Sequence, residues 1–224
     1  MLKKFIYPAP LLGLIFLVIP AAHAAEPTLA IGPQISTMGL GIVGIAKINT
    51  DLSARLSAQT FSYDISGVES GIDYDADLKL MSGLIAGDWF PAKGNFRITA
   101  GALINGNELE MTGKATGGTY TIGDTTYTAA EVGNLDGTVE FNNLAPYLGI
   151  GWGNPFNNQS NWSFSYDIGV VFQGSPDVSY NVNGTLANNA AFRAELEKER
   201  QELENELDEY QYYPVLAVGL NYRF

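Results

Sequence analysis

The chain has 224 residues, with 12 basic and 24 acidic side chains and a formal net charge of −12. It contains no cysteine, which excludes disulfides, thiolate metal sites and cysteine nucleophiles. Its single histidine, His23, lies in a segment that we expect to be removed, which disfavours acylases, phospholipases and proteases that use histidine as a general base. We therefore expect a protein that is not an enzyme and that uses no cofactor or metal.

Residues 1–24 have the pattern of a secretory signal peptide. Lys3 and Lys4 precede an apolar run over residues 11–19, and Ala22-His23-Ala24 follows as an A-x-A cleavage site. The apolar run is too short to span a membrane as a helix. Cleavage after Ala24 or Ala25 leaves residues 25–224 as one domain with 10 basic and 24 acidic residues.

The acidic balance bears on the partners of this domain. A net charge of −14 after cleavage argues against nucleic acid and favours cationic solutes, divalent cations or a basic protein surface. Acidic loops on an otherwise inert protein would account for the same charge.

Eight segments in which apolar and polar residues alternate predict antiparallel strands between turn-rich breaks. They cover residues 28–36, 39–48, 52–65, 74–90, 96–111, 138–153, 162–178 and 210–224. Residues 28–48 are open to a second interpretation as one long bent strand, but bacterial barrels have an even strand number. In residues 162–172 the alternation is clearest, with aromatic and branched residues on one side of the pleat.

The last strand shows the features of a transmembrane β-strand most plainly. Tyr212, Leu216 and Tyr222 lie on a uniformly apolar face with aromatics at both ends, while the other face is small or polar. Gly219, Tyr222 and Phe224 resemble the C-terminal signal by which outer-membrane barrels are recognised for insertion. A strand of a soluble sandwich is the alternative interpretation. With the signal peptide, these residues predict a Gram-negative outer membrane, where the partners are membrane lipid, lipopolysaccharide and the barrel-assembly machinery.

The lengths of the breaks predict the topology of an all-β, eight-stranded, antiparallel transmembrane up-and-down barrel, which we expect to be monomeric. Short turns would face the periplasm, and the extracellular loops would be residues 36–38, 66–73, 112–137 and 179–209. The third loop should contain a hairpin around Gly123-Asp124. The fourth should contain an acidic helix over residues 188–209, capped by Asn188 or Asn189. This helix is open to two interpretations, a cation-attracting lid or a solvated helix resting on the rim.

The same alternation predicts which charged side chains point into the barrel. Lys47, Arg55, Arg97, Asp167 and Arg223 should face inward, whereas Lys79 and Asp88 are placed less firmly. A barrel of about eight strands is just wide enough for side chains to fill, so these charges should pair with one another. The cluster is either a salt-bridged plug or a polar path for a small solute. Inward glycines would make room for Tyr147 or leave a narrow void.

Two acidic pairs are weak candidates for binding Ca²⁺ or Mg²⁺ at the outer rim. Asp75 with Asp77, and Glu108 with Glu110, place two carboxylates on one strand face. Solvated loop-base charges explain the same spacing more simply.

Several stretches resemble the CarO-type outer-membrane proteins. They are IGDTTYTAAEV (122–132), NNLAPYLGIGWG (142–153), YDIGVVFQGSPDV (166–178) and the acidic segment before YYPVLAVGL (212–220). The resemblance extends over residues 74–224, and it implies an eight-stranded barrel associated with uptake of ornithine and basic amino acids and with carbapenem susceptibility. No binding residue of the family is transferred, because these motifs are strand and turn scaffold.

We therefore expect a porin-like integral outer-membrane protein that passes or takes up small solutes, with basic amino acids implied by the resemblance. The alternative is a closed structural or surface-interaction barrel that acts through its extracellular loops.

Overall fold

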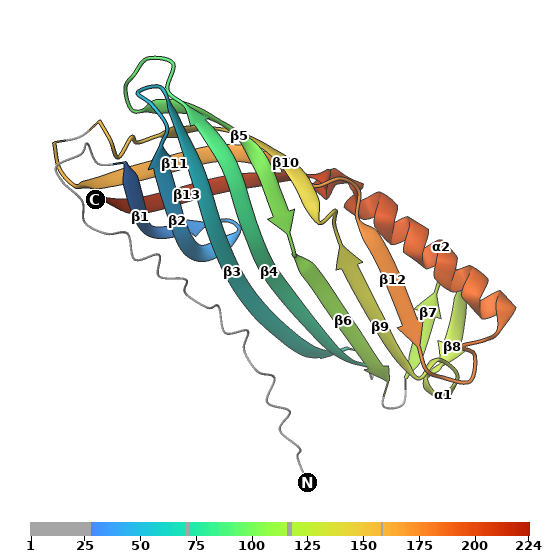
Figure 1. Cartoon of the computed structure of the whole chain (residues 1–224). Helices are drawn as coiled ribbons and strands as arrows, with labels where there is room; N and C mark the ends of the chain where they lie inside the picture. The colour runs from blue at the N-terminus through green and yellow to red at the C-terminus, as the bar shows by residue number, and fades with distance from the viewer. Residues whose placement is uncertain (1–27, 70–71, 116–117, 158) are drawn as a thin grey trace, which may run out of the picture.

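In the computed structural model, the chain forms a closed ring of antiparallel strands that continues on one side into an open sheet (Figure 1). The structure describes residues 28–69, 72–115, 118–157 and 159–224. The predicted signal peptide and its cleavage site lie outside these residues. None of the described helices combines the length and the apolar character that are needed to cross a bilayer.

Eight strands close the ring. In ring order they are β1 (Leu29–Ser36), β2 (Gly39–Lys47), β3 (Leu52–Glu69), β4 (Ile72–Trp89), β5 (Phe96–Asn105), β10 (Leu144–Trp152), β11 (Trp162–Phe172) and β13 (Tyr212–Arg223). Each pairs antiparallel with the next, and β13 pairs with β1 to complete the circle. Residues 28–48 form two strands, because the chain reverses at Thr37-Met38 and Gly39 adopts a φ of 118°.

The described residues contain thirteen strands, more than the eight barrel strands and the one loop hairpin that the sequence predicts. Beyond the ring, β3 and β4 continue as a long hairpin, and three further strands extend it into an open sheet. These are β6 (Glu108–Ala115), β9 (Asn134–Glu140) and β12 (Asp177–Val182), in the order β4-β6-β9-β12. We call β3 and β4 beyond Thr60 and Met81, with β6, β9 and β12, the outer sheet.

Three segments that were predicted as single strands are broken in two where the ring ends. The breaks fall at Gly106-Asn107, at Asn142-Asn143 and at Gly174-Ser175-Pro176, where Gly174 has a φ of 76°. Asparagine, glycine and proline favour turns, so the chain leaves the ring here and re-pairs in the outer sheet. The expected loop over residues 66–73 was also wrong in part, because β3 runs to Glu69 and β4 begins at Ile72.

A small α/β layer covers one end of the outer sheet. It consists of the hairpin β7 (Thr119–Ile122) and β8 (Thr125–Thr128), α1 (Ala129–Val132), α2 (Ala190–Leu207) and the 3₁₀ turn η1 (Asp208–Gln211). Tyr120, Ile122 and Val132 pack against Phe192 of α2, which is only 1% exposed. Asn189 caps α2 by accepting hydrogen bonds from the amides of Ala191 and Phe192, as its sequence predicts. The hairpin around Gly123-Asp124 is confirmed.

The ring and the outer sheet have opposite polarity. Around the ring the outward positions are apolar and exposed. Along β3 these are the even-numbered residues 52–58, and along β4 the odd-numbered residues 81–89. From the rung Phe61↔Leu80 onward the apolar residues occupy the other face, with Ser62, Asp64, Asp75 and Asp77 outside. Both strands switch at the same place.

Candidate functional site

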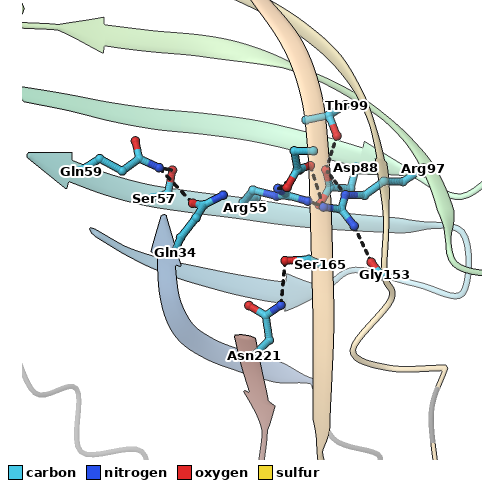
Figure 2. A network of polar contacts seen from close by, with 11 residues as sticks. Gln34, Arg55, Ser57, Gln59, Asp88, Arg97, Thr99, Gly153, Ser165 and Asn221 are labelled. Atoms are coloured by element: carbon cyan, nitrogen blue, oxygen red, sulfur yellow. Dashed lines mark hydrogen bonds and ion pairs between the residues drawn. The ribbon is translucent and has the colours of Figure 1, made fainter. Parts of the chain in front are cut away.

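A charge cluster fills the ring between its two ends. It consists of Arg55 from β3, Asp88 from β4, Arg97 from β5 and Asp167 from β11, none of which is more than 4% exposed (Figure 2). Arg55 donates to Asp88 Oδ2 from Nε at 3.0 Å and from Nη2 at 2.8 Å, and to both oxygens of Asp167 from Nη1 at 3.1 and 3.0 Å.

Arg97 completes the cluster from the other side. It donates from Nη2 to Asp167 Oδ1 at 2.6 Å and from Nη1 to the carbonyl of Gly153. Its Nε lies 3.7 Å from Asp88 Oδ1, which also accepts from the Thr99 hydroxyl at 2.7 Å. Two arginines and two aspartates balance in charge, and each charged group bonds to at least one opposite charge. That compensation is what allows four ionised groups to be buried in so narrow a space.

The strand register explains how the Arg97 side chain on β5 reaches Asp167 on β11 across the intervening strand β10. Arg97 lies opposite Gly151 of β10, and Gly151 lies opposite Asp167. A Cβ on Gly151 would stand 2.7 Å from Asp167 Oδ1 and 2.8 Å from Arg97 Cζ, so the intervening strand presents no side chain. The Arg97 guanidinium crosses this gap.

The structure brings together three of the five predicted lumen residues: Arg55, Arg97 and Asp167. Lys47 and Arg223 lie half-buried at the end of the ring that carries the short turns, and no contact with the cluster links them to it. Sequence analysis placed Asp88 less firmly and did not identify Thr99. The available signal was the alternation of Ser82, Leu84, Ala86 and Asp88, all of which are buried.

Further layers seal the ring on both sides of the cluster. Toward the outer sheet, Gln59 donates to Gln34 at 2.9 Å and to Ser57 at 3.2 Å (Figure 2). Ser82 in turn donates to the Gln59 side-chain oxygen. Beside these residues lies an apolar layer of Met38, Leu84, Ala86, Leu103, Ala145, Tyr147, Val171 and Val215. At the opposite end, Phe156 packs on Ala30, Val43 and Ile45.

The inward glycines make room for Tyr147 rather than for a void. A Cβ added at Gly169 or Gly149 would stand 2.4 or 2.6 Å from the Tyr147 hydroxyl. Together with the buried layers, this leaves the cluster out of contact with solvent. Both carboxylates of the cluster accept hydrogen bonds from arginine side chains, so the interactions within it are ion pairs.

The outer sheet offers a second candidate surface, which is acidic. Nine carboxylates share its polar face: Asp64, Asp73, Asp75, Asp77, Glu108, Glu110, Asp136, Glu140 and Asp177. Asp64 lies directly opposite Asp77, and Glu108 opposite Glu140, an arrangement that is unfavourable unless cations screen it. Lys79 pairs with Glu110 and Lys114 with Asp75. Within the described residues, no group of three such side chains is arranged to hold a metal ion.

The proposed insertion signal lies at the end of the ring with the short turns. The Tyr222 ring contacts Trp162 and Phe224 at centroid distances of 4.9 and 5.3 Å, and Gly219 faces inward beside Ser165. The role of these residues in insertion stays a prediction.

No protein-family model matches the chain, and no curated protein matches it. Several solved structures do, among them two from Acinetobacter baumannii. CarO and CarO2 of Acinetobacter baumannii each have a TM-score of 0.56 and are 21% and 20% identical to this chain. Each match covers 90% of this chain and all of the solved chain. The chain therefore has the CarO-type fold, a nearly all-β antiparallel barrel, and the resemblance predicted from its sequence is confirmed at the level of the fold.

Proposed function

We propose that the chain is an integral outer-membrane protein whose ring is a sealed anchor and whose outer sheet and α2 present an acidic surface to the medium. The support for the membrane location is the apolar outside of the ring. Leu56, Ile85, Ile150 and Ile168 are all at least 50% exposed, which would be costly in water.

Aromatic rings frame this apolar belt. Trp89, Trp152 and Trp162, each at least 50% exposed, lie next to the short turns, as in the interfacial girdles of membrane barrels. Phe172 and Tyr212 contact each other at the opposite rim, with ring centroids 5.7 Å apart. On β3 and β4 the belt spans nine residues each, 52–60 and 81–89, which matches the roughly 9–11 residues of a tilted transmembrane strand.

The burial of the charge cluster is the observation that favours a sealed barrel over a pore. A water-filled path past Arg55 and Arg97 would leave their guanidiniums accessible, yet these residues are 3% and 1% exposed. Opening a path requires breaking several charge-assisted hydrogen bonds together, each worth about 1.5–3 kcal/mol. The outer sheet, in contrast, leaves its charged side chains partly exposed to solvent.

Liposome swelling and single-channel recording test this proposal. Purified protein reconstituted in liposomes should give no swelling with arginine, ornithine or glucose beyond protein-free vesicles. A variant lacking residues 112–137 and 179–209 should still insert and keep heat-modifiable gel mobility while losing any binding of cationic partners. Flux of arginine through the unaltered protein at a saturable rate would contradict the sealed barrel.

Passage of small basic solutes is the second candidate. The acidic outer sheet would concentrate cations at the outer mouth. The resemblance to CarO-type proteins is the reason for considering this candidate. It requires a transient exchange of the Arg55 and Arg97 ion pairs. A flux of arginine that disappears in the presence of excess ornithine would support it over the sealed anchor.

A further inference from the structure

A cavity lies at the end of the ring that is opposite the outer sheet. Its volume is about 260 Å³, and it is lined by the three short turns around residues 48–51, 90–95 and 153–157. Phe156 separates it from the apolar layer of Ala30, Val43 and Ile45 inside the ring. No residue of the charge cluster or of the outer sheet lines this cavity, although Ser53 in its wall lies opposite Asp88 in the strand register.

The charge of this cavity is opposite to that of the molecule as a whole. Lys47 and Lys93 both line it, and no carboxylate does. Lys47 is already engaged within the protein. Lys93 differs from Lys79, Lys114 and Lys198, which are all paired with carboxylates, because no carboxylate among the described residues lies within ion-pair distance of it.

Side-chain amides in the wall are held by the turns, and Asn157 Nδ2 donates to the Lys93 carbonyl at 3.5 Å. The Asn49 oxygen accepts from the amides of Asp51 and Leu52 at 2.8 and 2.9 Å, which turns its NH₂ group away from the turn. Asn157 lines the cavity as well, and the backbone of Lys93 is held with a φ of 51°, in the left-handed region. Such a conformation is unusual for a residue other than glycine and persists only where the surrounding turn holds it.

Ser53 supplies the observation that points most directly to a ligand. Its side chain is 1% exposed and lines the cavity, yet its hydroxyl has no hydrogen-bond partner. A buried hydroxyl without a partner costs about 1–3 kcal/mol, so sites of this kind need an explanation. An acceptor bound in the cavity would satisfy it.

We propose that this cavity binds a small anion through a carboxylate or phosphate group, with Lys93 and the Ser53 hydroxyl as its donors. The volume lies below the range of about 300–1,000 Å³ that is usual for drug-sized ligands, so the ligand is small. Asp51 is the one carboxylate in the adjoining turn, outside the lining, and its charge would weaken the site.

The test uses ¹⁵N-labelled full-length mature protein in detergent micelles, titrated separately with inorganic phosphate and with succinate at constant ionic strength. We expect saturable amide shifts in residues 48–53, 90–95 and 153–157 and none in the outer sheet. Lys93→Gln should weaken the affinity at least about tenfold, because it removes one charge-assisted hydrogen bond. Ser53→Ala should weaken it several-fold, and Asp51→Asn should strengthen it.

Lys114→Gln, in the outer sheet, is the matched control and should leave the affinity unchanged. A stronger response to phosphate or to succinate identifies the source of the anionic group, and either response supports the site. The proposal is overturned if neither anion gives saturable shifts, or if Lys93→Gln and Lys114→Gln weaken binding equally. The expected amide shifts are the same whichever side of a membrane the short turns of the ring face.

Discussion

The ring and the outer sheet share strands β3 and β4, yet the apolar side chains of these strands lie on opposite faces in the two regions. In the ring, up to the rung Thr60↔Met81, β3 and β4 point apolar residues outward, and their inward sides carry Arg55 and Asp88. Above the rung Phe61↔Leu80, they point Asp64, Asp75 and Asp77 outward and Phe61, Tyr63 and Leu78 to the other face. An apolar exterior suits lipid and a charged exterior suits water, so in the proposed membrane location the switch marks a change of solvent along a continuous hairpin.

The two regions also differ in the burial and the pairing of their charged side chains. In the ring, four ionised groups are buried and mutually compensated. In the outer sheet, carboxylates lie opposite one another and remain exposed. The same substitution should therefore have a large effect in one region and a small one in the other.

The largest effect is expected at the centre of the cluster. Asp167→Asn leaves Arg55 and Arg97 sharing a single carboxylate, and breaking a buried ion pair in this way should lower the free energy of unfolding by about 3–5 kcal/mol. Glu110→Gln removes the exposed partner of Lys79 and should cost about 0–1 kcal/mol. Urea unfolding of the protein refolded in detergent measures both. Equal losses for the two variants would show that the cluster is not compensated as described.

A charge placed on the apolar belt should have the next largest effect. Leu56→Arg places a cation against lipid and should cost about 2–4 kcal/mol if Leu56 lies near the bilayer midplane. Ser62→Arg, on the same side of β3 but beyond the switch, should be nearly neutral. Unfolding in lipid vesicles measures the difference, and a neutral Leu56→Arg would contradict the membrane location.

Packing inside the ring gives a smaller effect. Gly169→Ala introduces a Cβ at 2.6 Å or less from three atoms of Tyr147, and such overpacking should cost about 1–3 kcal/mol. At Gly87 a Cβ meets no atom within 4 Å, so Gly87→Ala should leave the unfolding midpoint unchanged. If both variants unfold alike in the same denaturant series, the space around Tyr147 is not filled.

The smallest effect concerns α2 and its dependence on pH. Hydrogen bonds from Arg200 and Gln201 lower the pKa of Glu197 to about 2. Because the pKa is lower in the folded state, the stabilisation is complete above the ordinary value of 4.5 and is lost as the pH falls toward 2.

The carboxyl resonance of Glu197, followed by NMR, should titrate near pH 2 and should move up toward 4.5 in Arg200→Gln. Arg193→Gln is the control, because Arg193 bonds to Ala187 and Asn188 and not to Glu197. A titration near 4.5 in the unaltered protein would show that the contact does not form.

Sequence alternation predicted the faces of the ring correctly because a period of two is a local property. It identified Arg55, Arg97 and Asp167 as inward for that reason. Alternation does not give the height of a residue along the axis, which depends on strand tilt and register. Lys47 and Arg223 were therefore grouped with the cluster although they lie at one end of the ring. Asp88 was placed less firmly because residues 74–90 alternate less regularly and a bulge at Asp88-Trp89-Phe90 would have turned it to the other face.

The outer sheet was harder to predict because its pairings are non-local. Residues 96–111 were predicted as one strand, yet at Gly106-Asn107 the chain exchanges its ring partner β10 for β9. Nothing in the period of two distinguishes these partners. The switch of polarity at residues 60–61 and 80–81 was nevertheless present in the sequence, and comparison of the two strands would have located it.

Solvent accessibility along β3 tests the change of solvent most directly, and the absence of native cysteine makes single labelling straightforward. Spin labels would be placed one at a time on the outward side of β3, at residues 54, 56, 58, 62, 64 and 66, in protein reconstituted in liposomes. We expect oxygen to reach the first three labels more readily than a water-soluble nickel complex, and the order to reverse from residue 62 onward. Equal access of the nickel complex to all six labels would contradict the membrane belt and the account built on it.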